Sequence, residues 1–175
     1  MFHRYNSNIH CLTLHALRDI CAGEEILTSY IDICNSTAER RRILQHWGFE
    51  CGCDICFTED AEQDRRRSSL ARIILDMKLD ESRDAEQVWS TRQHQKALST
   101  AVEAIALMEE EGMYESDTLA EMYSKAAEHA VAVGSVHKGY EWALKAAEIE
   151  LKCCGKDSSD FAKADTFVIS LEGSQ

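Results

Sequence analysis

Three cysteines lie within six residues of this sequence, and their thiolates are close enough along the chain to bind one metal ion. They are Cys51, Cys53 and Cys56, in a C-x-C-x-x-C spacing. A structural zinc site takes four ligands, so the cluster supplies all but one. Several fourth ligands are open: Cys34, Cys11, Cys21, His46, a water molecule, or a ligand from a second chain. The cluster therefore predicts a zinc site whose fourth ligand lies outside the cluster.

The remaining composition indicates a reducing environment. The chain has 8 cysteines in 175 residues, and Met1 to His10 lack the apolar core of a signal peptide. No apolar run is long enough for a membrane-spanning helix. We therefore expect an intracellular protein, nuclear or cytoplasmic or both, without membrane contact. Thiols stay reduced in these compartments, so the cysteines are expected to bind metal or to be buried, not to form disulfides.

The formal net charge of −12 is unevenly distributed. Residues 1–58 carry 5 basic and 7 acidic side chains, whereas residues 59–175 carry 14 basic and 24 acidic ones. An acidic surface repels phosphate, which argues against direct nucleic-acid binding but is compatible with a basic protein partner. Two short arginine runs, at 40–42 and 65–67, are expected to be solvated helix faces.

Alternating apolar residues predict two strands in the first part of the chain, at 11–17 and 25–31. Residues 1–10 are expected to be poorly ordered. The Ser36-Thr37-Ala38-Glu39 sequence is typical of a capping box, in which the serine accepts from the backbone and the glutamate reaches back. It predicts a helix over 37–47 that ends at Gly48.

From Glu59 onward the apolar residues follow helical spacing. Glycines at 112, 134 and 155 are expected to end successive helices. Thr118-Leu119-Ala120-Glu121 is typical of a capping box, although Ser116 or Asp117 could equally be the N-cap, and Ser158 or Ser159 is expected to cap the last helix. A weak 43-residue repeat of this helix–Gly–cap pattern favours stacked helical hairpins that resemble tetratricopeptide (TPR) units. The expected fold is α+β, with a small β-rich domain at 1–57 and an all-α helical-hairpin domain at 58–175.

Three stretches in order carry a family resemblance: Gly23 to Asp32, Arg40 to Leu44, and Trp47 to Cys56. Together they resemble the C-terminal end of a SET domain with its cysteine-rich post-SET segment. SET-and-MYND-like and fungal SET-domain proteins are closest in pattern, and the resemblance covers roughly residues 8–57. This family transfers methyl groups from S-adenosylmethionine (SAM) to protein lysines. The resemblance therefore implies a histone or another basic protein as the substrate.

The resemblance also implies roles for single residues. Tyr30 matches the tyrosine that closes the active site beside the cofactor. Its phenol can orient the attacking amine and stabilise the polarised methyl hydrogens. Trp47 matches an aromatic residue that lines the lysine channel, and Phe49 matches one that packs on the adenine of SAM. The three clustered cysteines match three of the four post-SET zinc ligands.

Two family motifs are missing from these 175 residues. The fourth zinc cysteine belongs to an upstream Asn-His-x-Cys-x-Pro-Asn motif, and the chain contains no Pro. A Gly-rich cofactor loop is absent as well. We therefore expect a SET-domain protein without the front half of that domain, for example from a truncated gene model, that does not methylate on its own. Two alternatives remain open: a TPR-like helical interaction module without catalysis, and a non-functional remnant.

Overall fold

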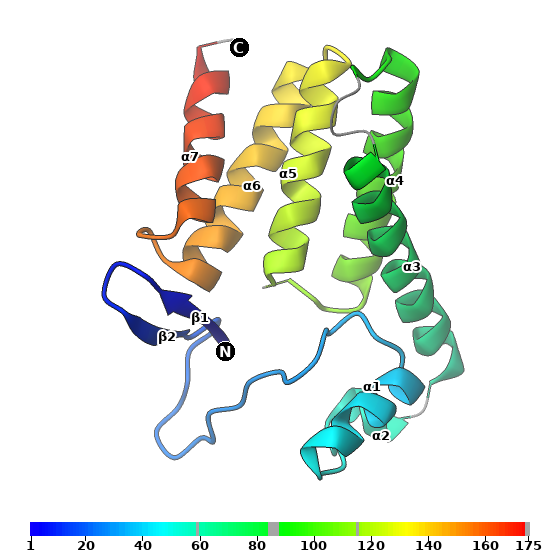
Figure 1. Ribbon diagram of the computed structural model, residues 1–175, viewed down its shortest axis with the longest axis vertical. Helices are drawn as coiled ribbons and strands as arrows, with labels where there is room; N and C mark the ends of the chain where they lie inside the picture. Colours follow the sequence, from blue (N-terminus) through cyan, green and yellow to red (C-terminus); the bar gives the residue numbers. More distant parts are fainter. Residues whose placement is uncertain (59, 84–87, 115, 174–175) are drawn as a thin grey trace.

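The computed structural model describes residues 1–58, 60–83, 88–114 and 116–173, and it confirms the α+β class (Figure 1). The elements follow in the order β1 (Phe2–Asn6), β2 (Cys11–His15), α1 (Thr37–Leu44), the 3-10 turn η1 (Gln45–Trp47), α2 (Asp54–Thr58), α3 (Ala61–Arg83), α4 (Thr91–Glu110), α5 (Asp117–Ala132), α6 (Val136–Cys154) and α7 (Ser159–Glu172). Glu59, where the helical part was expected to begin, lies outside the described residues. None of the described helices is both long and apolar enough to cross a membrane.

Helices α3 to α7 form a row in which each helix packs on the next (Figure 1). Their buried faces carry many alanines, which let α5 and α6 approach closely. Gly139 in α6 lies at one close approach, since a Cβ there would lie 2.7 Å from Cγ2 of Val131 in α5. The helical apolar spacing read from the sequence therefore corresponds to a packed core.

The predicted helix ends are present in the structure. Gly112, Gly134 and Gly155 have positive φ angles of 71°, 86° and 77°, a conformation that glycine adopts without steric cost. The capping box that was expected to begin at Thr118 is wrong, because Thr118 lies inside α5 and the alternative cap Ser116 accepts from the backbone N–H of Leu119 at 3.1 Å. Ser158 caps α7 in the same way. These serines satisfy backbone donors that the first helical turn leaves without a partner.

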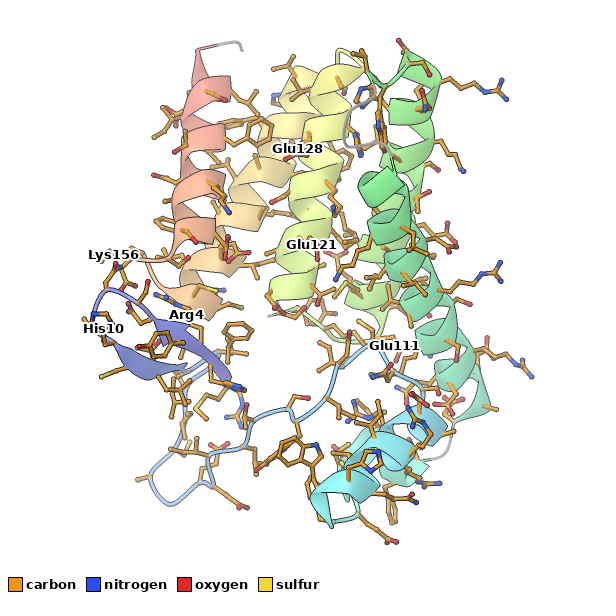
Figure 2. The ribbon with its side chains drawn as sticks, viewed as in Figure 1. Arg4, His10, Glu111, Glu121, Glu128 and Lys156 are labelled. Atoms are coloured by element: carbon orange, nitrogen blue, oxygen red, sulfur yellow. The ribbon has the colours of Figure 1, made fainter. Side chains whose placement is uncertain are left out.

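The expectation that residues 1–10 are poorly ordered is wrong. Residues 2–6 form β1 and pair antiparallel with β2, from Phe2 opposite His15 to Asn6 opposite Cys11. The hairpin docks on the C-terminal end of α6, where Arg4 donates from Nε to the carbonyl of Cys154 at 2.6 Å (Figure 2). Arg4 also forms an ion pair with Asp157 at 2.7 Å.

The predicted strand at 25–31 is also wrong, and the strand at 11–17 is shorter than expected. No described strand lies beside residues 25–31, so their backbone lacks the ladder of hydrogen bonds that defines a sheet. Side chains hold the segment instead: the hydroxyl of Thr28 donates to the carbonyl of Met1 at 3.3 Å and contacts the ring of His3. Alternating apolar residues indicate a segment that could form a strand, but a strand also requires a partner strand beside it.

The predicted helix at 37–47 divides into α1 and the turn η1. The Ser36 hydroxyl accepts from the backbone N–H of Glu39 at 3.4 Å, as expected. The carboxylate of Glu39 does not reach back, because it binds the guanidinium of Arg42. Half of the predicted capping box is therefore formed.

Candidate functional site

The structure brings together the three aromatic residues to which the sequence resemblance gave roles. The ring of Tyr30 lies 5.3 Å from that of Trp47 at an interplanar angle of 63°, and 5.4 Å from that of Phe49 at 69°. Both are edge-to-face contacts, which aromatic pairs favour. Tyr30 comes from the long segment after the hairpin, so two stretches that are distant in sequence meet at its ring.

Gly48 positions the two aromatic residues beside it. It ends η1 with φ 75° and ψ 22°, in the left-handed region that glycine favours. With the backbone in this conformation, Trp47 before the glycine and Phe49 after it contact the same Tyr30 ring. A side chain at position 48 would be strained in this conformation, although no atom lies close to its Cβ position.

Tyr30 and Phe49 line an open cavity of about 870 Å³. The cavity is lined by residues 27–31 and 49–53, by Ile33, Arg40, Leu44 and Ile55, and by Arg67 and residues 111–114 of the helical part. The three aromatic residues are largely exposed, Tyr30 at 54%, Trp47 at 59% and Phe49 at 41%. A cavity of this size can hold a drug-sized ligand, and its aromatic wall is accessible from solvent.

The cysteine cluster adjoins the same cavity. The Sγ atoms of Cys51, Cys53 and Cys56 all lie within 4.8 Å of one another. With Zn–S bonds of about 2.3 Å, the sulfurs of a tetrahedral site are about 3.8 Å apart, so the three thiols need only a small contraction around an ion. Three soft thiolate donors in this arrangement fit zinc.

The alternative fourth ligands do not join this cluster. Within the described part of the chain, the three cysteines are the one group of three or more potential ligands. Cys34 is buried in the helical core, and burial with the neighbouring Asp32 carboxylate raises its pKa to about 12. Cys11 and Cys21 are exposed and remain free thiols.

Arg40 packs directly against the cluster and gives it a positive neighbour. Its Nε donates to Sγ of Cys56 at 3.4 Å and its Nη2 to Sγ of Cys53 at 3.7 Å. Burial tends to raise the pKa of Cys53, but hydrogen bonds from the Cys56 backbone and from both neighbouring thiols, together with Arg40, lower it to about 7. Burial also raises the pKa of Cys56. This effect is larger than the lowering by the hydrogen bond or by the charge of Arg40, and the pKa of Cys56 is raised overall. The lowered pKa of Cys53 favours its thiolate, the form that binds metal.

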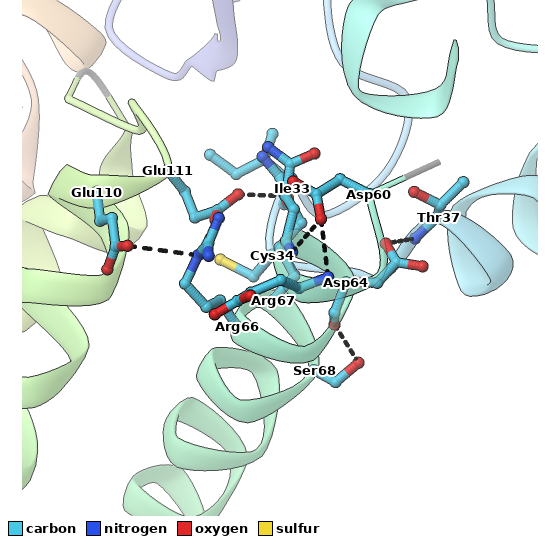
Figure 3. A network of polar contacts seen from close by, with 12 residues as sticks. Ile33, Cys34, Thr37, Asp60, Asp64, Arg66, Arg67, Ser68, Glu110 and Glu111 are labelled. Atoms are coloured by element: carbon cyan, nitrogen blue, oxygen red, sulfur yellow. Dashed lines mark hydrogen bonds and ion pairs between the residues drawn. The ribbon is translucent and has the colours of Figure 1, made fainter. Parts of the chain in front are cut away.

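The expectation that both arginine runs form solvated faces is wrong for one residue in each. Arg40 is 7% exposed and Arg67 is 1% exposed. In α3, the guanidinium of Arg67 contacts Glu111 at 2.9 Å and donates from Nη1 to the carbonyl of Ile33 at 2.6 Å (Figure 3). Arg66 binds the other Glu111 oxygen at 2.6 Å. This network ties the chain just after Tyr30 to the helical part.

Sequence reasoning missed both arginines as site residues. A run of arginines beside acids is usually solvated, so the pattern gave no reason to single out one member. For Arg40, the useful signal was its place on a helix that directly precedes a cysteine cluster. For Arg67, the partners Ile33 and Glu111 are distant in sequence, and no local pattern relates them.

Comparison with known proteins gives relatives for part of the chain. Over 74 residues it is 47% identical to "Histone-lysine N-methyltransferase set5" of Schizosaccharomyces pombe, which covers 39% of this chain and 23% of that protein. It is 39% identical over 80 residues to SET5 of Candida albicans, covering 42% of this chain and 17% of that one. It is 43% identical over 54 residues to human "Histone-lysine N-methyltransferase SMYD3", covering 30% and 13%. The chain thus spans less than a quarter of these relatives' lengths, and no family model matches it.

Proposed function

We propose that this chain, a SET-domain protein by its relatives, supplies the C-terminal part of a SAM-dependent protein-lysine methyltransferase site. The observation that carries the proposal is the contact of the Tyr30 ring with both Trp47 and Phe49, beside a cavity that Tyr30 and Phe49 line. These are the residues for which the resemblance implies contact with the transferred methyl group, the lysine and the cofactor. They come from two segments, and only the fold brings them together.

Each aromatic residue has a separate task in this proposal. The phenol of Tyr30 accepts a hydrogen bond from the neutral lysine amine. This bond aligns the lone pair of the amine nitrogen with the methyl carbon. Trp47 forms a wall that packs on the aliphatic part of the lysine side chain. Phe49 offers its ring to the adenine. SAM, when bound, supplies the methyl group as an electrophilic carbon on a positively charged sulfur.

The cysteine cluster has a structural task. Cys51, Cys53 and Cys56 would hold a zinc ion that fixes the segment carrying Phe49 to helix α2. A structural site has four ligands, and the resemblance implies a cysteine from an upstream motif as the fourth. In the isolated chain we propose that water takes this position.

We propose that these 175 residues do not methylate by themselves. The aromatic rings are largely exposed, and Ile26 and Leu27 of the unpaired segment are 60% and 67% exposed. Methyl transfer requires a site from which water is excluded and in which the amine is held in line. Further polypeptide packed against residues 25–31 would supply that enclosure.

The proposed substrate is a lysine in a basic protein such as a histone, in the nucleus or the cytoplasm. The names of the relatives state histone-lysine methylation for those proteins. The net charge of −12 supports a basic partner, because opposite charges favour encounter. The negative surface of the protein repels the phosphates of nucleic acid.

A second candidate is a helical interaction module without catalysis. It is favoured by a cavity of about 380 Å³ whose lining includes Ile73, Trp89 and Ala97, in the helical part and separate from the aromatic cluster. Grooves between helices can hold an extended or helical peptide. This reading predicts binding of a peptide without any requirement for Tyr30.

Methyl transfer from labelled SAM to histones separates the two candidates. The chain itself is expected to give no transfer. A chimaera in which its first 57 residues replace the corresponding stretch of the fission yeast relative is expected to methylate histones. Transfer by the isolated chain would contradict the proposed incompleteness. A folded but inactive chimaera, beside an active parent, would contradict the proposed methyltransferase site.

A further inference from the structure

We infer that Arg40 is a positioning residue of the cysteine cluster, which strengthens metal binding by donating hydrogen bonds to Cys53 and Cys56 and by offsetting their negative charge. This inference rests on the proposed zinc site. It assigns to α1, which carries none of the three cysteines, a direct influence on the metal.

The geometry of α1 supports this role. Arg40 extends from α1 to two sulfurs at 3.4 and 3.7 Å, distances at which an N–H group can donate to sulfur. The next residue, Arg41, donates from Nη2 to the backbone carbonyl of Cys56 at 2.9 Å. Two adjacent arginines therefore fasten α1 to the short helix that carries Cys56.

The charge balance supports it as well. The guanidinium of Arg40 is almost buried, and no described carboxylate is paired with it. A buried cation without a counter-charge is costly, so the sulfurs are its partners. With zinc bound, three thiolates give the site a net charge of −1, and a fourth would give −2. Arg40 reduces this excess negative charge without occupying a ligand position.

The position of the guanidinium explains how it can assist without blocking the metal. It contacts Cys53 and Cys56, whereas no contact joins it to Cys51 among the described residues. It therefore lies along one edge of the sulfur triangle. All three sulfurs keep lone pairs for an ion, and the hydrogen bonds orient two of them, as outer-sphere donors do in other metal sites.

The test compares Arg40→Met, Arg40→Lys and the control Arg42→Met in the full 175-residue chain. Arg42 lies on the same helix, is exposed, and pairs with Glu39, away from the sulfurs. The affinity for zinc is measured by competition with a chromophoric chelator. The sulfur-to-cobalt charge-transfer band of the Co²⁺-loaded chain reports the hydrogen bonds to sulfur.

We expect Arg40→Met to lower zinc affinity about 10- to 100-fold, the range for loss of an outer-sphere partner, and to shift the cobalt band. Arg40→Lys keeps the positive charge, so its zinc affinity is expected to fall less. Arg42→Met is expected to bind zinc with the affinity of the unaltered chain. Circular dichroism checks that the helices persist. If Arg40→Met loses α1, the zinc affinity and the cobalt band of Arg40→Lys still test the inference.

Three results would overturn the inference. Unchanged affinity and an unchanged cobalt band in both Arg40 variants would show that the arginine only packs nearby. Tighter zinc binding by Arg40→Met would show that it competes with the metal. Failure of the unaltered chain to bind zinc would remove the zinc site and the inference together, while leaving the chimaera test of methyl transfer unaffected.

Discussion

The guanidinium of Arg67 and the carboxylate of Glu111 form a buried ion pair, with side-chain exposures of 1% and 0%. Arg67 belongs to α3, Glu111 caps the end of α4, and both line the cavity that contains Tyr30. Because Arg67 also binds the carbonyl of Ile33, the pair fixes the chain three residues beyond Tyr30. The helical part therefore helps to position the proposed methyl-transfer residue.

Glu111→Gln is expected to destabilise the chain strongly, because it leaves the Arg67 guanidinium buried with no carboxylate partner. Breaking a buried pair in this way costs about 3–5 kcal/mol in the free energy of unfolding. Urea denaturation measures the change. Asp76→Asn is the matched control, since Asp76 pairs with Arg72 on the exposed surface, and it is expected to change stability by no more than about 0.5 kcal/mol. Equal effects of the two variants would refute the importance assigned to the buried pair.

Gly139→Ala tests the close contact between α5 and α6. Alanine favours helix formation by about 1 kcal/mol over glycine, but the new Cβ would lie 2.7 Å from Val131 Cγ2 and 3.1 Å from the carbonyl of Ala127. We expect a net loss of about 1–3 kcal/mol, the usual cost of overpacking. Thermal unfolding measures it. Adding Val131→Ala should recover part of the loss, and a stabilised Gly139→Ala chain would show that the helices are less tightly packed.

Docking of the hairpin is expected to weaken in acid. The hydrogen bond from Asn6 is the largest cause of the lowered pKa of Asp157; burial opposes it, and the charge of Arg4 lowers the pKa further. A carboxyl with a folded-state pKa below its unfolded value, about 3.9, stabilises the fold above that value. The contribution is lost as the pH falls through the folded pKa.

Hydrogen-exchange protection factors of residues 2–15, followed from about pH 5 downward, measure this effect. The unaltered chain should lose protection over this range. Asp157→Asn should have less protection at neutral pH and a flatter profile. Asp160→Asn, which removes an exposed pair with Lys163, serves as the control. A profile for Asp157→Asn as steep as that of the unaltered chain would assign the acid sensitivity to other groups.

Zinc is expected at about one ion per chain in carefully reduced protein, with three cysteine ligands and water. Cys53→Ser should abolish this stoichiometry, and Cys21→Ser should not, because Cys21 is an exposed thiol outside the cluster. Elemental analysis of purified protein measures the metal. Removal of zinc by a chelator should increase hydrogen exchange in residues 49–58 and leave α4 to α7 unchanged. Zinc retained by Cys53→Ser would place the metal elsewhere.

The sequence predicted the local features of this fold well and the long-range ones poorly. The glycine ends depend on neighbouring residues, so a local pattern identifies them. For the N-caps the local pattern only narrowed the choice, since α5 is capped by Ser116 and not by Thr118, and α7 by Ser158. A strand depends on its partner. Residues 2–6 became a strand through pairing with β2 and docking on α6, whereas residues 25–31 alternate correctly but have no described strand beside them.

The site divides in the same way. The cysteine cluster could be predicted because its three members lie within six residues of each other, whereas Trp47 and Phe49 were singled out by the family resemblance. The convergence of Tyr30 on that stretch came from family resemblance and not from a local pattern. The burial of Arg40 and Arg67 could not be predicted, because it depends on which face of each helix meets the rest of the chain.

Tyr30→Phe in the chimaera with the fission yeast relative, assayed for methyl transfer from labelled SAM to histones, tests the proposed role of this tyrosine. The substitution keeps the ring that packs on Trp47 and Phe49 and removes only the hydroxyl. Tyr5→Phe is the control, since Tyr5 is exposed on the hairpin. We predict that Tyr30→Phe lowers kcat by about 10²–10³-fold, as loss of one preorganised hydrogen-bonding group does, and that Tyr5→Phe has no effect. Unchanged kcat in a folded Tyr30→Phe chimaera would contradict the proposed role of this tyrosine.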